Sequence, residues 1–242
     1  MPIIYQHNIN ERTKLAVWHI TEPESFFLQR VPLKKEVSHP HKRLQHLAGR
    51  YLLPDLFPGF PLDAIRVADT RRPFLDNEQY HFSISHCGNF AAAIVSTAQR
   101  VGVDIEEITP RIEKVQHKFV SAEEWAFLSS GFEVRSSGFG VRGSEFGSLR
   151  ATGLEDRTPE PPNLRTSELL TLLWSAKEVI FKWYGSGQLD FKRHMLLAGP
   201  LAMDAEGGIT MPFSFNANGD HQPLTIQGRF FGQTVLSWTS TG

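Results

Sequence analysis

Residues 167–184 have the sequence SELLTLLWSAKEVIFKWY, which is the strongest helical pattern in the chain. Apolar residues recur there at the three- and four-residue spacing of an amphipathic helix. Ser167 or Thr166 can cap the start of this helix, and Gly185 can end it. Because so many of its side chains are apolar, we expect the helix to be largely buried, with partners for its few polar groups.

Three side chains of this helix share one broad face, because Trp174, Glu178 and Lys182 are spaced four residues apart. One interpretation is a solvated Glu–Lys pair, which adds about 0.2–0.5 kcal/mol to helix stability. The other is that Glu178 and Lys182, together with Lys177, point into a cleft where they meet a metal ion and a phosphate chain. The helix alone leaves both interpretations open.

Upstream of the helix, residues 101–107 read VGVDIEE and are typical of a short β-strand. Side chains alternate between the faces of a strand, so Asp104 and Glu106 project from the same side. Gly102 leaves room for the close approach of backbone or ligand. Two carboxylates on one face suit Mg²⁺, which prefers oxygen ligands. An exposed strand face with two ordinary acids is the alternative.

The rest of the chain predicts an α+β arrangement twice over. Strands are expected at residues 14–20, 80–85, 90–96 and 101–105, and helices at 23–31, 40–53, 111–119 and 121–130. Pro54 is expected to end the helix over 40–53, and Ser121 with Glu124 has the pattern of a capping box. A mainly antiparallel sheet is expected from segments 189–191, 195–203, 208–215, 223–231 and 233–238. The predicted halves are residues 1–99 and 100–242.

Residues 131–166 interrupt this pattern. GFEVRSS, GFGVRGS and EFGSLR follow one another at a period of seven, and a stretch rich in Pro, Thr and charge comes after them. Three such short units are too few for a solenoid. We interpret the segment as a low-complexity insertion that is mostly disordered. The alternative is an aromatic and arginine-rich arm that grips a partner.

Composition excludes several classes of protein. The chain has 242 residues, a net charge of -1, 40% apolar residues and a single cysteine. These values are ordinary for a globular protein and argue against a nucleic-acid binder, a disulfide framework and a multi-cysteine zinc site. The apolar run at 90–95 is too short to span a membrane, and no secretory signal is visible. We therefore expect a soluble cytoplasmic protein.

The charges are unevenly distributed along the chain. Residues 1–72 carry 11 Lys/Arg and seven Asp/Glu, with most of the excess in 34–50, whereas acidic residues gather between 104 and 124. A basic part beside an acidic part suits a site where an anion meets a metal ion. Two solvated surfaces of opposite sign are the other interpretation.

The segment FSISHCGN, residues 82–89, raises the possibility of a nucleophilic serine or cysteine. Adjacent strand residues face opposite ways, so Ser85 and His86 do not face each other, and no G-x-S-x-G elbow surrounds the serine. An anion-binding or structural histidine fits better. The histidines in HPHKRLQH, residues 39–46, lack a closed zinc-ligand set and are better explained as phosphate contacts or surface residues.

Taken together, the motifs resemble those of the Sfp-type 4'-phosphopantetheinyl transferases. V-G-V-D-I-E at 101–106 followed by W-S-A-K-E-V-I-F-K at 174–182 resembles the paired signature of that family. F-S-I-S-H at 82–86, R-R-P-F at 71–74 and F-V-S-A-E-E-W at 119–125 resemble further family motifs. Without residues 131–166, the two main motifs lie at about the family's usual separation. The family fold implied is a pseudo-dimer of two similar α/β halves with the site between them.

The resemblance implies a role for each matching residue. Asp104, Glu106 and Glu178 correspond to Mg²⁺ ligands. Glu124 corresponds to the family's suggested general base, with a metal-bound water as the alternative base. Lys182 corresponds to a residue that holds phosphate oxygens, and we expect it to be a catalytic residue as well as a coenzyme contact.

The resemblance also implies a set of coenzyme contacts. Lys177, like Lys182, would hold phosphate oxygens. Arg72 and His86, with the neighbouring Ser85, would bind the adenosine 3'-phosphate end of coenzyme A. Arg43 or Arg50, in a loosely matched basic helix, would contact a nucleotide phosphate. Arg72 stands where the family commonly has lysine, which keeps the charge but changes the geometry.

The implied activity is a Mg²⁺-dependent transfer of 4'-phosphopantetheine from coenzyme A to a serine of an apo acyl or peptidyl carrier protein, releasing 3',5'-ADP. A catalytically impaired homologue that binds coenzyme A or a carrier, disabled by the insertion, is the alternative. A metal-dependent phosphohydrolase is a third interpretation. A fused pseudo-dimer needs no partner subunit, so we expect a monomer that binds neither nucleic acid nor membrane.

Overall fold

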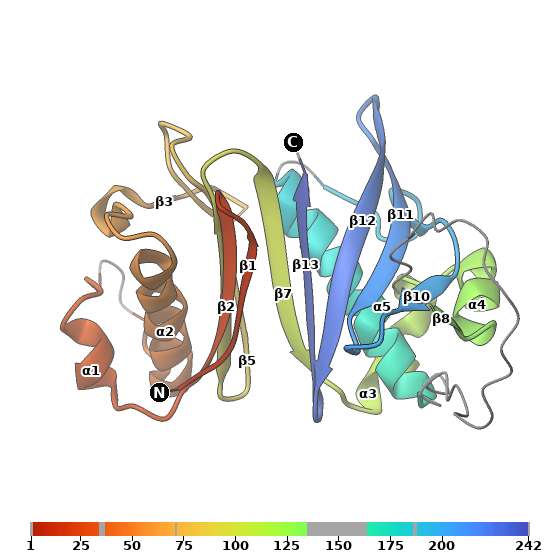
Figure 1. Ribbon diagram of the computed structural model, residues 1–242, viewed down its shortest axis with the longest axis horizontal. Coiled ribbons are helices and arrows are strands. Elements are labelled where there is room, and N and C mark those ends of the chain that lie inside the picture. The colour runs from red at the N-terminus through yellow and green to blue at the C-terminus, as the bar shows by residue number, and fades with distance from the viewer. Residues whose placement is uncertain (1, 34–36, 71, 135–163, 186–187, 242) are drawn as a thin grey trace, which may run out of the picture.

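The computed structural model describes residues 2–33, 37–70, 72–134, 164–185 and 188–241. The chain forms two α+β halves that lie side by side, each built around its own sheet (Figure 1). It passes from one sheet to the other between β6, which ends at Ser96, and β7, which begins at Arg100. No helix in the described residues is long and apolar enough to cross a membrane.

The first half is an antiparallel sheet with the strand order β1-β2-β6-β5. Its strands are β1 (Ile3–Asn10), β2 (Thr13–His19), β5 (His81–Cys87) and β6 (Phe90–Ser96), and its helices are α1 (Glu24–Leu28) and α2 (Pro40–Leu56). A short two-stranded sheet joins β3 (Arg66–Val67) to β4 (Pro73–Phe74), after a 3-10 turn at Leu62–Ala64. α2 covers one face of the main sheet, where its apolar side chains form a core with β2, β5 and β6.

The second half is a seven-stranded sheet that follows the order β7-β13-β12-β11-β10-β8, with β9 paired to β11. Its strands are β7 (Arg100–Glu107), β8 (Phe132–Val134), β9 (Met195–Leu197), β10 (Leu201–Met203), β11 (Ile209–Ala217), β12 (Asp220–Phe231) and β13 (Thr234–Thr241). The helices are α3 (Arg111–Val115), α4 (Ala122–Ser129) and α5 (Thr166–Tyr184), with a 3-10 turn at Gln116–Lys118. The predicted antiparallel C-terminal sheet is therefore confirmed.

α5 is the long buried helix predicted from the sequence. Its apolar face packs on β7, β12 and β13, with Leu170, Leu173 and Val179 in the core. The predicted cap was wrong, because the helix begins one residue earlier and the Glu168 carboxylate accepts a hydrogen bond from the Arg165 backbone N–H at 2.6 Å. Gly185 ends the helix as predicted, in the left-handed conformation at φ 71°.

Several boundaries differ from the sequence prediction. α2 continues through Pro54 to Leu56, since a proline in the last turn removes a single helical hydrogen bond while Leu53 and Leu56 stay buried. The helix predicted over 111–119 divides into α3 and a 3-10 turn. Residues 189–191 form no strand, and β1 had not been predicted.

Part of the predicted insertion is ordered. Residues 132–134 form β8, which pairs in parallel with β10, so this end of the segment interpreted as mostly disordered is an ordered strand. Residues 135–163 lie outside the described residues, and so do Lys34, Lys35 and Arg71.

A further cluster of buried apolar side chains lies between the two sheets and joins the two halves. Leu15, Val17 and Ile94 from the first sheet meet residues of β7 and β13 there, and all are buried. Strand alternation turns Val101, Val103 and Ile105 of β7 toward this shared core. The other face of β7, which carries Gly102, Asp104 and Glu106, is therefore left for α5.

Candidate functional site

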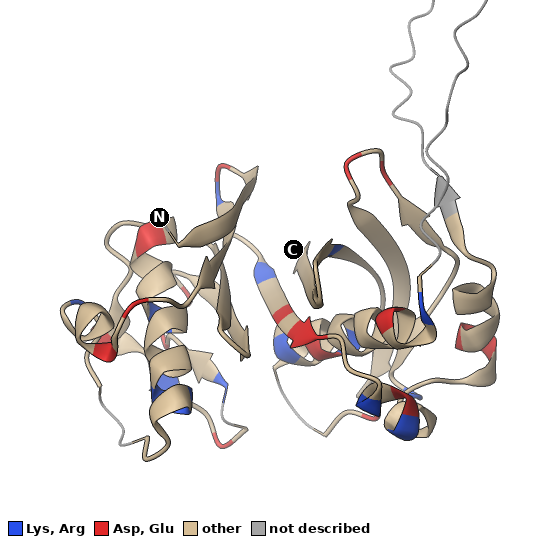
Figure 2. Cartoon of the chain, turned by 90° about the horizontal axis from the view of Figure 1, so that it is seen from below, with Lys and Arg blue, Asp and Glu red and all other residues tan. Residues whose placement is uncertain are grey.

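Gly102 allows β7 to lie directly against α5. A Cβ atom at this position would be 2.4 Å from the Val179 carbonyl oxygen and 3.2 Å from the Trp183 Cβ. Only glycine fits such a close approach, as the sequence suggested. Figure 2 shows the resulting arrangement, in which the acidic part of β7 runs beside α5 where the two halves meet.

Asp104, Lys182 and Ser85 form a hydrogen-bonded cluster at this contact. Lys182 Nζ lies 2.6 Å from Asp104 Oδ1 and 2.8 Å from Ser85 Oγ, and Ser85 Oγ donates to the same Asp104 oxygen at 2.8 Å. Asp104 is only 2% exposed, and its second oxygen, Oδ2, is buried without a hydrogen-bond partner. Residues from β5, β7 and α5 therefore build one buried polar centre, which joins the two halves.

Glu106 and Glu178 extend this centre with two more carboxyl groups. Trp174 Nε1 donates a hydrogen bond to Glu106 Oε1 at 3.3 Å. Burial, together with the charge of Asp104, raises the pKa of Glu106 to about 7. Burial and Asp104 also raise the pKa of Glu178. The Asp104 charge therefore acts on both glutamates.

Whether these groups suit a metal ion can be judged from their geometry. In the described part of the chain, no three His, Cys, Asp or Glu side chains are arranged as a closed metal-ligand set. Lys182 instead neutralises one oxygen of Asp104. The unpartnered Asp104 Oδ2 and the raised pKa values of Glu106 and Glu178 are what a divalent cation would relieve, because it would compensate the negative charge. The carboxylate oxygens are the donor type that Mg²⁺ prefers.

A basic groove of about 670 Å³ lies beside this centre. His39, Lys42, His46 and Arg50 line it from the α2 side, and His86 lines it from β5. Arg50 Nη1 donates to His46 Nδ1 at 3.0 Å, and burial lowers the pKa of Arg50. The groove offers several cationic and hydrogen-bonding groups to one elongated anion.

His86 connects the groove to the polar centre, because it directly follows Ser85 on β5. Its side chain reaches solvent, yet the surrounding protein lowers its pKa by desolvation, and the nearby Lys182 charge lowers it further. Asp104 acts in the opposite direction. His86 is therefore a neutral hydrogen-bonding group at neutral pH rather than a fixed positive charge.

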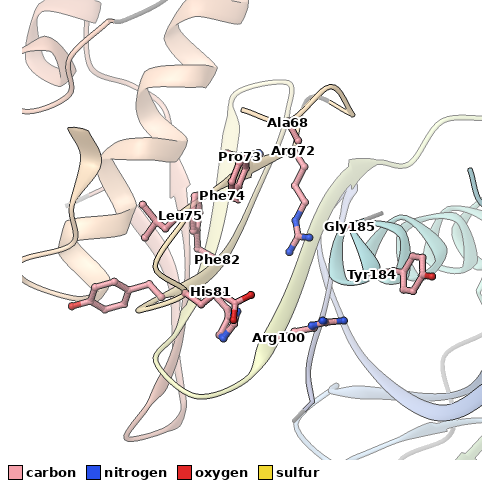
Figure 3. Close-up of a pocket in the computed structure, with 12 residues that line it drawn as sticks. Ala68, Arg72, Pro73, Phe74, Leu75, His81, Phe82, Arg100, Tyr184 and Gly185 are labelled. Atoms are coloured by element: carbon pink, nitrogen blue, oxygen red, sulfur yellow. The ribbon is translucent and has the colours of Figure 1, made fainter. Parts of the chain in front are cut away.

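Two of the predicted coenzyme contacts lie outside this groove. Arg43 Nε is 2.8 Å from Glu24 Oε1 in an ion pair, and Arg43 Nη1 donates to the Val37 carbonyl at 3.1 Å. Arg72 extends into a different cavity, toward Gly185 at the end of α5 (Figure 3). The prediction that Arg72 and His86 bind the same phosphate is not supported, since the two side chains line separate cavities.

The predicted roles of Glu124 and Lys177 also need correction. Lys177 is 0% exposed and Glu124 is 1% exposed, with Lys177 Nζ 2.7 Å from Glu124 Oε1. Lys177 also donates to two backbone carbonyls, and Glu124 accepts from the backbone N–H groups of Ser121 and Leu197. Both charges are fully satisfied inside the second half. Glu124 therefore holds the start of α4, and neither residue can reach a coenzyme from this position.

A shallow depression of about 240 Å³ lies on another side of Glu106. Glu106, Glu107 and Trp174 line it together with apolar side chains of α3, namely Ile112 and Val115. Glu106 is thus accessible from this depression, while the cluster that it belongs to borders the basic groove. The arrangement can receive an anion on one side and a second reactant on the other.

Lys42 was not singled out from the sequence, although a signal for it was present. Lys42, His46 and Arg50 are four residues apart in α2, so helical spacing places them on one face, whereas Arg43 falls beside that face. Applying this spacing to residues 40–53 would have selected the groove-lining set.

Comparison with known proteins covers the part of the chain that holds these motifs. Residues 100–200 match the family model of the 4'-phosphopantetheinyl transferase superfamily. A search of curated proteins found no match. The matched segment contains β7 with Asp104 and Glu106, and α5 with Glu178 and Lys182. The predicted resemblance is thereby confirmed at the level of the superfamily, because residues 100–200 are similar to the 4'-phosphopantetheinyl transferases.

Proposed function

We propose that the protein transfers the 4'-phosphopantetheine group of coenzyme A to a serine of an apo acyl or peptidyl carrier protein and releases 3',5'-ADP. The observation that carries this proposal is the Asp104–Lys182–Ser85 cluster, with Glu106 and Glu178 beside it, of which all residues except Ser85 lie in the segment that matches the superfamily. No nucleophile of the enzyme is required, because the attacking hydroxyl belongs to the carrier. This agrees with the absence of a Ser–His pair at 85–86.

The basic groove is the proposed site for the nucleotide part of coenzyme A. Lys42 and Arg50 supply positive charge, His86 supplies a hydrogen-bonding group, and the groove leads to the polar centre at Ser85. An extended ligand held there would place its pyrophosphate near Lys182. Arg50 replaces Arg43 as the proposed phosphate contact from α2, because Arg43 is committed to Glu24.

The polar centre is the proposed site of the chemistry. Asp104, Glu106 and Glu178 would hold Mg²⁺, which supplies charge neutralisation to the pyrophosphate. Lys182 would orient a phosphate oxygen and stabilise the negative charge that develops as the phosphoanhydride bond breaks. Ser85 and Asp104 keep the Lys182 ammonium group in place for this task.

The carrier serine would enter through the depression beside Glu106. Its proton must pass to a group or a water molecule at that place, and the described carboxyl groups there are Glu106 and Glu107. Glu106 is already assigned to the metal ion, which would compensate its charge, so a water molecule at this place is the proposed proton acceptor. This assignment replaces the one that the sequence suggested for Glu124.

The finer parts of the sequence prediction stay within this proposal. They are the Sfp type, the pseudo-dimer of similar halves at 1–99 and 100–242, the monomeric state and the cytoplasmic location. The alternative is a homologue that binds coenzyme A or a carrier without transfer, because residues 131–166 impede docking.

Intact-mass analysis of apo carrier proteins after incubation with coenzyme A and Mg²⁺ tests the activity. We expect the mass of 4'-phosphopantetheine to be added to at least one carrier type, and Glu178→Gln to abolish the addition. Glu113→Gln is the matched control, because Glu113 lies on α3 and outside the polar centre. Thermal unfolding of each variant shows that a lost activity is not a lost fold.

The same experiment separates the alternatives. Coenzyme A binding without any mass gain on all carriers, restored by deletion of residues 135–163, would favour the impaired homologue. Carrier-independent release of phosphate from coenzyme A would indicate a phosphohydrolase. Either result would overturn the proposed transfer by the intact chain.

A further inference from the structure

Ser83 is a second buried serine on β5, two residues before Ser85. Residues two apart on a strand project from the same face, so both hydroxyls point the same way. Phe82 and Ile84 belong to the core that α2 covers, which leaves the two serines on the face that turns toward the second half. Ser83 is 6% exposed, so its hydroxyl needs a partner inside the protein.

The partner of Ser83 is the backbone of β7. β5 and β7 lie side by side, and each is the last strand in the order of its own sheet. Among the described strands, β7 pairs with β13 alone, so the backbone N–H groups of alternate residues point away from β13. The Val103 N–H is one of these, and it donates to Ser83 Oγ at 3.2 Å. A hydroxyl therefore joins the edges of the two sheets where no backbone ladder does.

This hydrogen bond holds β7 at the residue directly before Asp104. Ser85 holds the next position, because its Oγ donates to Asp104 Oδ1 at 2.8 Å. Two contacts from one strand fix the register of β7 against β5, whereas a single contact would leave β7 free to slide or rotate. Lys182 Nζ depends on this register, since it lies 2.6 Å from the same Asp104 oxygen. Val103 is fully buried, so its N–H would lack a partner without Ser83.

Ser96 makes bonds of the same kind without any connection to Asp104. It lies on β6, is 0% exposed, and accepts from the backbone N–H groups of Ala98 and Gln99 at 3.2 and 3.1 Å. Both bonds stay within the turn that follows β6. The residue that pairs with Ser96 on β5 is His81, four residues before Ser85. Ser96 is therefore a matched control for the loss of a buried serine hydroxyl.

We propose that Ser83 is a positioning residue for the polar centre. Its hydroxyl fixes the β7 backbone beside Asp104 and so holds the Asp104 carboxylate against Lys182 and Ser85. The inference rests on the proposed transferase function, because it assigns the chemistry to this centre. Ser83 lines neither the basic groove nor the depression beside Glu106. Its loss should therefore slow the chemical step and leave coenzyme binding almost unchanged.

Ser83→Thr and Ser83→Val form the sharpest pair of variants. Both side chains have the same branched shape, so any strain from the added methyl group is common to them, and only threonine keeps the hydroxyl. We expect kcat of Ser83→Val to be about ten- to a hundredfold below that of Ser83→Thr, because a small displacement of reacting groups costs about this much. KM for coenzyme A should differ by less than about twofold. Ser96→Ala should keep the wild-type kcat.

Hydrogen exchange of the Val103 amide, followed by NMR, tests the contact without any need for transfer activity. Exchange should be about tenfold faster in Ser83→Val than in Ser83→Thr, because the amide has lost its acceptor. The amides of Gly102 and Asp104 point toward β13 and should change little. Ser96→Ala should leave the exchange of Val103 as it is in the wild type.

Midpoints of thermal unfolding test whether Ser83 acts through Asp104. Ser83→Ala and Ser85→Ala should together lower the midpoint by less than the sum of their separate effects, because a loosened β7 has already lost part of the Ser85 contact. Ser96→Ala and Ser85→Ala should lower it additively, since they share no partner.

The outcomes separate this inference from the proposed function. Equal kcat values for Ser83→Thr and Ser83→Val, or equal exchange of Val103 in the two proteins, would overturn the positioning role in an active enzyme. A wild-type protein that modifies no carrier would overturn the transferase function instead. The exchange and midpoint measurements then decide the positioning role by themselves, and additive midpoints for Ser83→Ala and Ser85→Ala would overturn it.

Discussion

Lys177 and Glu124 lie in motifs that suggested function, yet they form a buried ion pair. We expect Lys177→Met to lower the free energy of unfolding by about 3–5 kcal/mol, because it leaves the Glu124 carboxylate buried without a counter-charge. Glu124→Gln in the same chain should recover part of this loss, since the unpaired charge is then absent. Urea unfolding of the single and double variants measures both effects. A Glu124→Gln protein with wild-type stability and no transfer activity would instead return this residue to the catalytic site.

Glu106 predicts how stability depends on pH in protein stripped of metal by a chelator. The folded protein raises the pKa of Glu106 to about 7, whereas the unfolded chain releases this proton near the ordinary glutamate pKa of 4.5. The folded state thus binds more protons between these values, so the stability contributed by this group is present below about pH 4.5 and is lost as pH rises through 7. We expect wild type to lose about 2–3 kcal/mol more than Glu106→Gln between pH 5 and pH 8.

Urea unfolding at several pH values, with and without Mg²⁺, provides the measurement. Mg²⁺ should restore stability to wild type above pH 7 and have a smaller effect on Glu106→Gln, because a cation compensates the carboxylate charge. Parallel pH profiles for the two proteins would show that Glu106 does not titrate in this range.

The sequence indicated most residues of the polar centre, but it did not show how deeply each side chain is buried. Strand alternation paired Asp104 with Glu106, and four-residue spacing paired Glu178 with Lys182. Lys177 was assigned to the same cleft, but it precedes Glu178 and so points away by about a quarter turn of a helix with 3.6 residues per turn. Its side chain reaches the interior near α4.

Among the elements, the contact between β7 and α5 controls the site. Gly102→Ala should destabilise the protein by about 1–3 kcal/mol, because the new methyl group meets a backbone carbonyl that cannot move away easily. The same change should reduce transfer activity, since it separates Asp104 from Lys182. Gly199→Ala is the matched control, where the nearest atom is Pro212 Cγ at 3.3 Å. Equal unfolding free energies for the two variants would contradict this role of the contact.

The elements that sequence reasoning found were those with clear periodicity. β6 and α5 were predicted to within about a residue, because β6 is buried from Ala91 to Ser96 and α5 has one continuous apolar face. β1 was not predicted, since its residues IIYQHNIN mix apolar and polar side chains at the sheet edge without regular alternation. Pro54 does not end α2 as predicted, because burial of the leucines around it stabilises the last turn more than the loss of one hydrogen bond destabilises it.

For the whole molecule, the shared core between the sheets determines whether the halves can exist apart. Composition and periodicity predicted two α+β halves, but they could not show that Leu15, Val17 and Ile94 face the second half rather than solvent. These side chains are fully buried, and the seam that they form also brings Ser85 to Asp104. The uneven distribution of charge along the chain reflects the same two halves. The basic groove belongs to the first half, and most of the acidic centre belongs to the second.

Separate production of residues 1–99 and 100–242 tests this dependence. We expect each half alone to aggregate or to lack a cooperative thermal transition, because the apolar face of the shared core is exposed to water. Mixed during refolding, the halves should form a one-to-one complex that elutes with the intact chain in size-exclusion chromatography. Ile94→Glu in the first half should prevent this assembly, because it places a charge in the shared core. A first half that unfolds cooperatively by itself, at a midpoint near that of the intact chain, would show that the shared core contributes little to its stability. The two sides of the polar centre would then be held together only by the covalent connection between the halves.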